Sequence, residues 1–116
     1  MREILSAKIH RAIITEANVD YEGSITISSE FLEKTGICEY EKVLVADVNN
    51  GARFETYVIA TDTPKTFCIN GAAALLVNEG DKIIIMAYKF MGEESISLHK
   101  PKIIIIDDDN NIINNV

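Results

Sequence analysis

The chain has 116 residues, of which 47% are hydrophobic, and this is the size of a single domain whose core needs no metal or disulfide to hold it. The formal net charge of −7 at pH 7 argues against a nucleic-acid partner, and aliphatic runs such as residues 103–106 are far shorter than the roughly 20 residues that cross a bilayer. Cys38 and Cys68 form no paired motif and are expected to be buried small hydrophobes, so we predict a cytoplasmic protein with no membrane, nucleic-acid or metal partner.

The first third of the chain predicts two strands and a helix. A strand is expected over residues 3–15, because polar and apolar side chains alternate there. One face would carry Ser6, Lys8 and His10, and the other would carry Leu5, Ala7, Ile9 and Ile13. A polar connection over 16–20 leads to a short strand over 24–27. A helix over 29–35 follows, since Ser28 or Ser29 can cap its start and Gly36 can end it.

The middle of the chain predicts a hairpin. Strands over 42–48 and 52–60 flank Asn49-Asn50-Gly51, which is a strong turn signal. Alternation along the return strand places Arg53 and Tyr57 on one face and Thr56 on the other. Together with Lys8, these side chains are expected to point in conflicting directions, so that one small domain could not easily bring them to one site. Sharing of strands between subunits would remove the conflict.

The last part of the chain predicts short strands joined by turns. Strands are expected over 67–69 and 82–90 and, at the edge of the sheet, over 102–106, with a helical turn over 92–97 and a disordered tail over 110–116. Asn70-Gly71-Ala72-Ala73-Ala74 is a tight turn into a helical turn, whose small side chains either expose backbone N–H groups to an anionic group or pack closely on the sheet. Six or seven short strands with few helical turns predict a mainly β class and a small barrel.

The peptide bond between Gly23 and Ser24 has a chemistry that most peptide bonds lack. The Ser24 hydroxyl can attack the Gly23 carbonyl and move the acyl group from nitrogen to oxygen, and glycine lowers the cost of a strained backbone or a close approach there. The resulting ester can eliminate to dehydroalanine, which hydrolyses to a pyruvoyl group. A Gly-Ser pair between two strands is far more often a plain turn, so this interpretation depends on the motifs around it.

Five motifs stand in one order along the chain: Lys8-Ile9-His10-Arg11, Tyr21-Glu22-Gly23-Ser24, Asn50-Gly51-Ala52-Arg53-Phe54-Glu55-Thr56-Tyr57, Asn70-Gly71-Ala72-Ala73-Ala74 and Gly80-Asp81. With these motifs the chain, from residue 1 to about residue 109, resembles the bacterial aspartate 1-decarboxylase family. The resemblance implies a double-psi β-barrel over residues 1–109, assembled as a homotetramer with active sites between subunits. It also implies decarboxylation of L-aspartate to β-alanine and CO2 for the biosynthesis of pantothenate and coenzyme A.

The same resemblance implies a role for each matching residue. Self-cleavage between Gly23 and Ser24 would give a short chain, 1–23, and a longer one, 24–116. Ser24 would become the pyruvoyl group that forms a Schiff base with the substrate, so neither an external cofactor nor a metal is expected. Thr56 would assist cleavage and contact substrate, and Tyr57 would donate a proton. The substrate would be bound by Arg53, Lys8, Gly71, Ala72, Ala73 and Asn70.

Some alternatives stay open at this level. His10 is interpreted equally well as a hydrogen-bonding group behind the cleavage site and as a packed strand histidine. Ala46 stands where some relatives carry a tryptophan near the pocket. Arg53 would serve glutamate as well as aspartate, and self-cleavage could be spontaneous or need a helper protein. A non-catalytic barrel of the same fold is the other alternative, against which stands the joint presence of Ser24, Thr56, Tyr57 and Arg53.

Overall fold

The computed structural model describes residues 1–115 and consists mainly of strands. The strands are β1 (Arg2–Ile13), β2 (Glu16–Asn18), β3 (Ser24–Ser28), β4 (Lys42–Asp47), β5 (Arg53–Thr61), β6 (Phe67–Asn70), β7 (Lys82–Met91), β8 (Lys102–Ile106) and β9 (Ile112–Asn115). The helices are α1 (Ser29–Thr35), the 3-10 helix η1 (Gly71–Leu76) and α2 (Glu93–Ile96). The predicted mainly β class is therefore confirmed.

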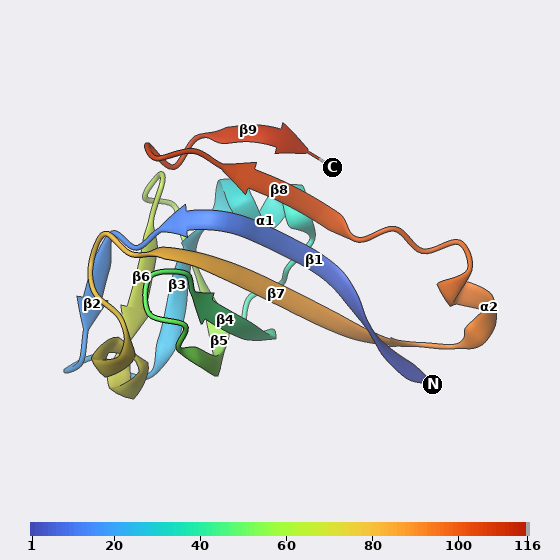
Figure 1. Cartoon of the computed structure of the whole chain (residues 1–116), viewed down its shortest axis with the longest axis horizontal. Coiled ribbons are helices and arrows are strands. Elements are labelled where there is room, and N and C mark those ends of the chain that lie inside the picture. Colours follow the sequence, from blue (N-terminus) through green and yellow to red (C-terminus); the bar gives the residue numbers. More distant parts are fainter. Residues whose placement is uncertain (116) are drawn as a thin grey trace.

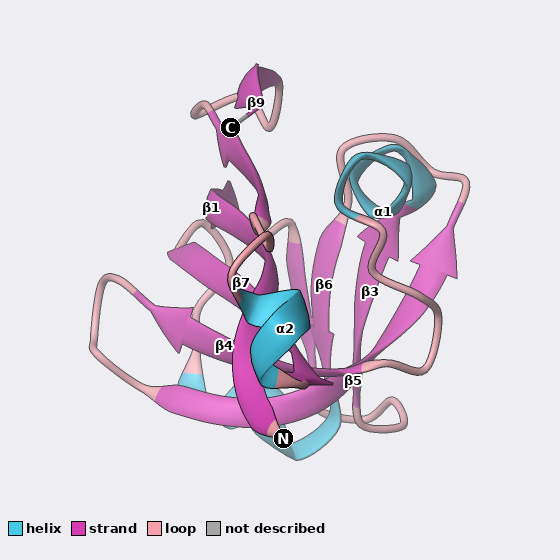
Figure 2. Cartoon of the chain, turned by 90° about the vertical axis from the view of Figure 1, so that its right-hand side faces the viewer, coloured by secondary structure: helices cyan, strands magenta, loops and turns pink. Residues whose placement is uncertain are grey.

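The strands follow the order β2-β6-β3-β5-β4-β7-β1-β8-β9 in one curved sheet (Figure 1). Three neighbouring pairs, β2–β6, β3–β5 and β1–β8, are parallel, whereas the other pairs are antiparallel. Figure 2 shows the two halves of the sheet, with β1, β4 and β7 in one half and β3 and β6 in the other, below α1. Among residues 1–115 no pairing joins the outermost strands β2 and β9, so a closed double-psi barrel stays a prediction.

The hydrophobic core lies between the two halves of the sheet. Ile9, Val45 and Ile85 come from one half, Ile25 and Ile69 from the other, and all five are fully buried. Helix α1 adds Phe31, whose ring centroid lies 4.6 Å from that of Phe67 in β6. Full burial of one such side chain contributes roughly 1.5–3 kcal/mol, so this core holds the two halves against each other.

Helix α1 begins and ends where its sequence predicts. Ser28 occupies the N-cap position, and Gly36 follows the helix with a φ of 76°. The Gly36 N–H donates to the Leu32 carbonyl, which lies 2.8 Å away. A left-handed residue at this position costs glycine little, because glycine has no Cβ, and it turns the chain away from the helix axis.

The face of β1 changes within the strand, which the alternation pattern alone did not predict. Its pairing with β7 shifts register between His10 and Ala12, and Arg11 between them has a φ of 69°. A bulge of this kind inserts one residue and switches which side chains point inward. Ala12 is therefore buried, whereas Ile13, predicted to share a face with Ala7 and Ile9, is only half-buried.

The C-terminal segment differs most from its prediction. Strand β8 is not at the edge of the sheet, because it lies between β1 and β9. The tail over 110–116 was predicted to be disordered, but residues 110–115 form a turn and strand β9. Val116 lies outside the described residues. The reason is the buried Asn110, whose Oδ1 accepts from the Ile13 N–H at 2.9 Å and whose Nδ2 donates to the Ile13 carbonyl at 3.0 Å. Two hydrogen bonds to the backbone N–H and C=O of the same residue hold this turn on β1 and bring β9 beside β8.

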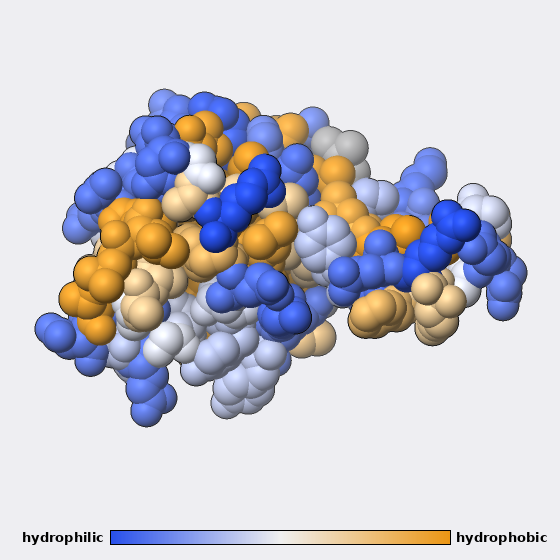
Figure 3. Space-filling model, turned by 60° about the horizontal axis from the view of Figure 1, so that its bottom comes forward, coloured by the Kyte–Doolittle hydropathy of each residue, from blue (hydrophilic) through white to orange (hydrophobic). Residues whose placement is uncertain are grey.

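An arm formed by residues 1–5 and 88–98 projects from the body of the molecule (Figure 1). The molecule measures 44 Å along its longest axis and 27 Å along the other two. Figure 3 shows apolar side chains on this arm beside charged ones, and Phe90 and Leu98 are 67% and 88% exposed. No helix within residues 1–115 is long and apolar enough to span a bilayer.

Candidate active site

The Gly23–Ser24 bond lies at the entrance to β3. Gly23 is exposed in the turn before the strand, whereas Ser24, its first residue, is only 4% exposed. Gly71 packs directly on this turn: a Cβ at position 71 would lie 2.5 Å from the Gly23 Cα. Gly71 also has a φ of 75°, in the left-handed region. A Cβ at Gly23 itself would meet no atom within 4 Å, so the close approach predicted for Gly23 is made possible by the missing Cβ of Gly71 instead.

Asn70 connects Ser24 to its surroundings. It is the residue of β6 directly opposite Ser24, and it is 5% exposed. Its Nδ2 donates hydrogen bonds to Ser24 Oγ and to Thr26 Oγ1, at 3.0 Å each. The hydroxyl that would attack the Gly23 carbonyl is therefore held by a side chain within the same chain.

Cys68 and Glu16 continue this arrangement and were not predicted as site residues. The Cys68 Sγ lies 3.0 Å from Asn70 Oδ1 and 3.3 Å from Glu16 Oε2. Burial first, and then the hydrogen bond and charge of Glu16, raise the pKa of the Cys68 thiol to about 12, so the thiol stays protonated at neutral pH. Cys38, predicted to be buried as well, is exposed.

We call Ser24, Thr26, Asn70, Cys68 and Glu16 the Ser24 network. Its members occupy adjacent positions across three strands, since Thr26 is opposite Cys68 and Cys68 is opposite Glu16. They share the face of the sheet that points away from the core, because alternate residues such as Ile25 and Ile69 are fully buried on the other face. The sequence signal that could have predicted this network is the spacing of two residues between its members within a strand, as in Ser24 and Thr26 of β3 and in Cys68 and Asn70 of β6.

Thr56 and Tyr57 reach this region from β5. Ile25 of β3 is opposite Val58 of β5 in a parallel pair. Continuing this register toward the start of β3 places Ser24 beside Tyr57, and Gly23 beside Thr56. Tyr57 is 37% exposed and Thr56 is half-buried. Thr56 and Tyr57 thus directly precede the part of β5 that pairs with β3 and point to opposite faces of the strand, as the predicted alternation requires.

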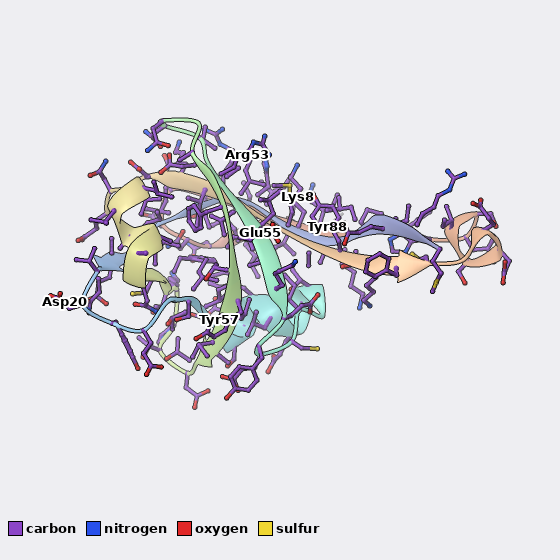
Figure 4. All side chains as sticks on the ribbon, turned by 90° about the horizontal axis from the view of Figure 1, so that it is seen from below. Lys8, Asp20, Arg53, Glu55, Tyr57 and Tyr88 are labelled. Atoms are coloured by element: carbon purple, nitrogen blue, oxygen red, sulfur yellow. The ribbon has the colours of Figure 1, made fainter. Side chains whose placement is uncertain are left out.

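Lys8 and Arg53 lie on an outer face that also carries Tyr57. Cross-strand pairing aligns Lys8, Met86, Leu44 and Glu55 on β1, β7, β4 and β5. Arg53 and Tyr57 lie two residues before and after Glu55, so they share its face. Of the side chains predicted to conflict, Lys8 therefore shares a face with Arg53 and Tyr57, and only Thr56 points to the other side. Figure 4 looks onto this outer face and shows Lys8, Arg53 and Glu55 grouped together, with Tyr57 farther along β5.

The outer face has unneutralised positive charge. Within residues 1–115, neither Lys8 nor Arg53 has a carboxylate within 4 Å, whereas Lys42 Nζ pairs with Glu55 Oε2 at 3.0 Å. A groove of about 710 Å³ runs along the same face toward the arm, but neither Lys8 nor Arg53 lines it, and its charged lining is mostly acidic. It is lined by Glu3, Glu41, Lys42, Val43, Leu44, Glu55, Tyr88 and Phe90. Two free cations on a protein of net charge −7 are a local site for an anionic ligand.

His10 and Ala46 belong to the same outer face. Pairing aligns His10 with Ile84, Ile84 with Ala46, and Ala46 with Arg53. Burial first, and then the charges of Lys8 and Arg11, lower the pKa of His10, and its buried Nδ1 has no hydrogen-bond partner within residues 1–115. Strands β5, β4 and β7 separate His10 from Ser24 in the sheet order, so within one chain His10 lies with the cations and not with the Ser24 network.

The remaining predicted residues follow Asn70 in η1. Gly71 is buried against the turn that contains Gly23, Ala72 is exposed, and Ala73 is half-buried and packs on the core. Close packing, one of the two interpretations of this segment, therefore holds for Gly71 and Ala73, and Ala72 is free to contact a ligand.

Comparisons with known proteins agree with the resemblance seen in the motifs. The family model for aspartate decarboxylase matches residues 1–113. The chain is 55% identical over 112 residues to an aspartate 1-decarboxylase of Caldicellulosiruptor saccharolyticus, which covers 96% of this chain and 88% of that protein. It is 54% identical over 107 residues to one of Campylobacter jejuni, covering 92% and 85%, and 53% identical over 110 residues to one of Clostridium kluyveri, covering 94% and 87%. The chain belongs to the aspartate decarboxylase family.

Proposed function

We propose that this chain is a self-processing decarboxylase that converts L-aspartate to β-alanine and CO2 and so supplies pantothenate biosynthesis. The observation that carries the proposal is the buried Ser24 hydroxyl, held by Asn70 next to a glycine turn, in a chain of this family. The names of the relatives favour aspartate over glutamate. Retention of Ser24 with Thr56, Tyr57 and Arg53 argues against a non-catalytic barrel.

Cleavage uses groups of the chain itself. Ser24 Oγ bonds to the Gly23 carbonyl carbon, the C–N bond breaks, and the hydroxyl proton passes to the Ser24 nitrogen. Loss of the Ser24 Cα proton then breaks the Cβ–Oγ bond, so Gly23 departs as a carboxylate and dehydroalanine remains. Water hydrolyses dehydroalanine to the pyruvoyl group and ammonia. The products are chains 1–23 and 24–116, and Thr56, beside Gly23 in register, supplies a hydroxyl for the oxyanion of the first step.

The surroundings of Ser24 fit a pyruvoyl group. A neutral carbonyl needs hydrogen-bond donors, and the Asn70 Nδ2 group lies 3.0 Å from the position of the Ser24 side chain. When formed, the pyruvoyl group supplies the electron sink for decarboxylation, so the reaction requires neither an external cofactor nor a metal. Asn70 and the backbone at Gly71 are the parts of the chain that would hold it.

The outer face supplies the groups that bind and protonate the substrate. Arg53 binds the side-chain carboxylate, which survives the reaction, because a cation on the departing carboxylate would stabilise the ground state instead. Lys8 adds positive potential at the same place. Tyr57, beside Ser24 in register, delivers the proton to Cα after CO2 has left.

The same geometry supports a homotetramer with active sites between subunits. Arg53 and Tyr57 are four residues apart on β5, so their Cα atoms are separated by roughly 13 Å, more than the length of an aspartate. Lys8 and Arg53 of one chain would therefore complete the site of Ser24 and Tyr57 of another. Exposed Phe90 and Leu98 on the arm offer apolar surface for such a contact. We propose that the assembled enzyme acts in the cytoplasm, because its reaction is a step of small-molecule biosynthesis.

The direct test of self-processing is denaturing mass spectrometry of the wild type and of Ser24→Ala. The wild type should give two fragments that meet at Gly23–Ser24, the larger with a hydrazine-reactive N-terminus, and should release β-alanine from L-aspartate. Ser24→Ala should stay intact and inactive, whereas Ser95→Ala, an exposed serine in α2, should behave like wild type. Cleavage of Ser24→Ala, or full activity of an uncut wild-type chain, would contradict the proposal.

Mixing of variants tests whether the site is shared. Ser24→Ala chains retain Arg53, and Arg53→Ala chains retain Ser24, so mixed oligomers should recover activity if the two residues act across an interface. A mixture of Ser24→Ala with Tyr57→Phe should recover little, since Tyr57 is expected to serve Ser24 of its own chain. Equal lack of recovery in both mixtures, with subunit exchange demonstrated, would favour a site within one chain.

A further inference from the structure

The orientation of the Asn70 carboxamide decides what Ser24 can do. A carboxamide has one end that only accepts hydrogen bonds and one that only donates them. Ser24 and Thr26 cannot select between the two ends, because a hydroxyl both donates and accepts. The third neighbour is the Cys68 Sγ, 3.0 Å from Asn70 Oδ1; its S–H group is a donor, and its sulfur, unlike a hydroxyl oxygen, is only a weak acceptor. The thiol is therefore the member of the Ser24 network that can fix the carboxamide.

We propose that Cys68 is a positioning residue for self-cleavage: its thiol donates to Asn70 Oδ1 and so keeps the Asn70 NH2 group directed at Ser24 and Thr26. Cys68 is 6% exposed and lies in register between Thr26 and Glu16, so its side chain is confined to this row. Its thiol remains protonated across the neutral pH range, since its pKa is raised to about 12. The inference rests on the proposed self-processing of the chain.

The consequence for the reaction concerns the Ser24 proton. With the NH2 group directed at it, Ser24 Oγ accepts a hydrogen bond, and no other residue among 1–115 accepts one from its O–H group. The acyl shift needs that proton on the Ser24 nitrogen as the C–N bond breaks. If the carboxamide turned over, Asn70 Oδ1 would accept a hydrogen bond from the Ser24 O–H group and hold its proton away from the Ser24 nitrogen. Removing the thiol donor permits this second orientation and slows cleavage.

Substitution of Glu16 distinguishes an orienting role of Cys68 from a purely structural one. The thiol has one proton, and Glu16 Oε2 at 3.3 Å competes with Asn70 Oδ1 for it. Glu16 itself is exposed, so its substitution changes little in the packing. Removal of Glu16 should therefore leave the thiol proton to Asn70, and cleavage should proceed at least as fast as in the wild type.

The experiment follows appearance of the 24–116 fragment by denaturing mass spectrometry in freshly refolded full-length chains. Cys68→Ala should slow cleavage about fivefold, the fold-change equivalent to one ordinary hydrogen bond. Cys68→Ser, whose hydroxyl accepts as well as donates, should also slow cleavage, by no more than Cys68→Ala does, and Cys38→Ala, which removes the exposed cysteine, should cleave at the wild-type rate. Urea unfolding of each variant in the uncleavable Ser24→Ala background separates slow cleavage from poor folding.

A double variant completes the test. In an Asn70→Ala background no carboxamide remains to be oriented, so adding Cys68→Ala should have no further effect on the cleavage rate. Wild-type cleavage by Cys68→Ala, stronger slowing by Cys68→Ser than by Cys68→Ala, or an additive effect on Asn70→Ala would each overturn the role of Cys68. Slowing by Glu16→Ala would also overturn it. Failure of the wild type to cleave at all would instead remove the proposed self-processing on which the inference rests.

Discussion

The Ser24 network and the outer face of β1, β7, β4 and β5 contrast in their exposure. Ser24, Asn70 and Cys68 are each less than 10% exposed and are joined by hydrogen bonds within the chain. Arg53 and Tyr57 are exposed, and neither Arg53 nor Lys8 has an ion-pair partner within residues 1–115. An intramolecular cleavage can use groups that the chain holds by its own packing, whereas a reaction on free aspartate needs groups that solvent can reach. Maturation and turnover should therefore respond to different substitutions.

The largest effect is expected at the contact between the cleavage turn and η1. Gly71→Ala would place a Cβ 2.5 Å from the Gly23 Cα and would force the turn to move. A displacement of about 1 Å at a reacting bond can cost about 100-fold in rate, so cleavage should slow by at least that factor and activity should be lost with it. Mass spectrometry of the purified chain measures the uncut fraction.

Gly51→Ala is the matched control for this substitution. Gly51 has a φ of 77°, close to that of Gly71, but a Cβ there would meet no atom within 4 Å. Gly51→Ala should lose about 1 kcal/mol of unfolding free energy from the left-handed backbone, and Gly71→Ala should lose more, because its Cβ also meets the Gly23 backbone. Normal cleavage by Gly71→Ala, or equal slowing by Gly51→Ala, would show that the contact with Gly23 does not position the bond.

Tyr57→Phe should separate the two regions most clearly. The substitution removes one oxygen from a partly exposed side chain, so cleavage at Gly23–Ser24 and hydrazine reactivity should be unchanged. Production of β-alanine should fall by roughly 100-fold, the lower end of what a positioned acid contributes to a proton transfer. If fully matured Tyr57→Phe enzyme makes β-alanine at the wild-type rate, another group protonates Cα.

Arg53→Ala should act on turnover alone and to a smaller extent. A hydrogen bond to a charged group contributes roughly 1.5–3 kcal/mol, so kcat/KM for L-aspartate should fall by about ten- to one-hundred-fold, mainly through KM. Cleavage should proceed normally, since Arg53 makes no contact in the Ser24 network. Lys34→Ala removes an exposed cation from α1 and serves as the control. Slower self-cleavage in Arg53→Ala would show that the outer face also contributes to maturation, which contradicts the separation of the two regions.

The smallest effect is expected at Asp47, which belongs to neither region. Burial first, and then the neighbouring Asp81 carboxyl, raise the pKa of Asp47, so the folded chain binds this proton more tightly than the unfolded chain does. The contribution of Asp47 to stability is therefore fully present below its unfolded pKa and is lost as the pH rises through the raised value. Asp47→Asn, whose NH2 group can donate to Asp81, should raise the unfolding free energy at pH 7.5 by about 1 kcal/mol.

The pH dependence of that difference is the measurement. Urea unfolding in the Ser24→Ala background at pH 5 and pH 7.5 should show the advantage of Asp47→Asn shrinking as the pH falls and Asp47 takes up its proton. Cleavage and turnover should stay within about twofold of wild type, because Asp47 lies at the β4–β5 turn. An advantage that grows toward pH 5 would contradict the direction of the pKa shift.

Local features of the sequence were sufficient to predict the structure wherever a short stretch determines its own conformation. Gly36 ends α1 because a left-handed residue costs glycine little, and the alternation of Arg53, Thr56 and Tyr57 persists because no bulge interrupts their pairing with β4. The chemistry of Gly23 and Ser24 is also local, since one hydroxyl and the preceding carbonyl carry it. These features, read with five motifs in fixed order, predicted the family and the mainly β class, which are confirmed, whereas the cleavage bond stays a prediction.

Contacts between distant strands were decided by the tertiary structure. The bulge at Arg11 moved Ala12 inward, and the turn at Asn110 brought β9 beside β8, because both depend on partners far away in sequence. Register between β2, β6 and β3 joined Glu16, Cys68 and Ser24 through Asn70, although 52 residues separate Glu16 from Cys68. Alternation tells which residues of a strand share a face, but register and strand order decide which faces meet.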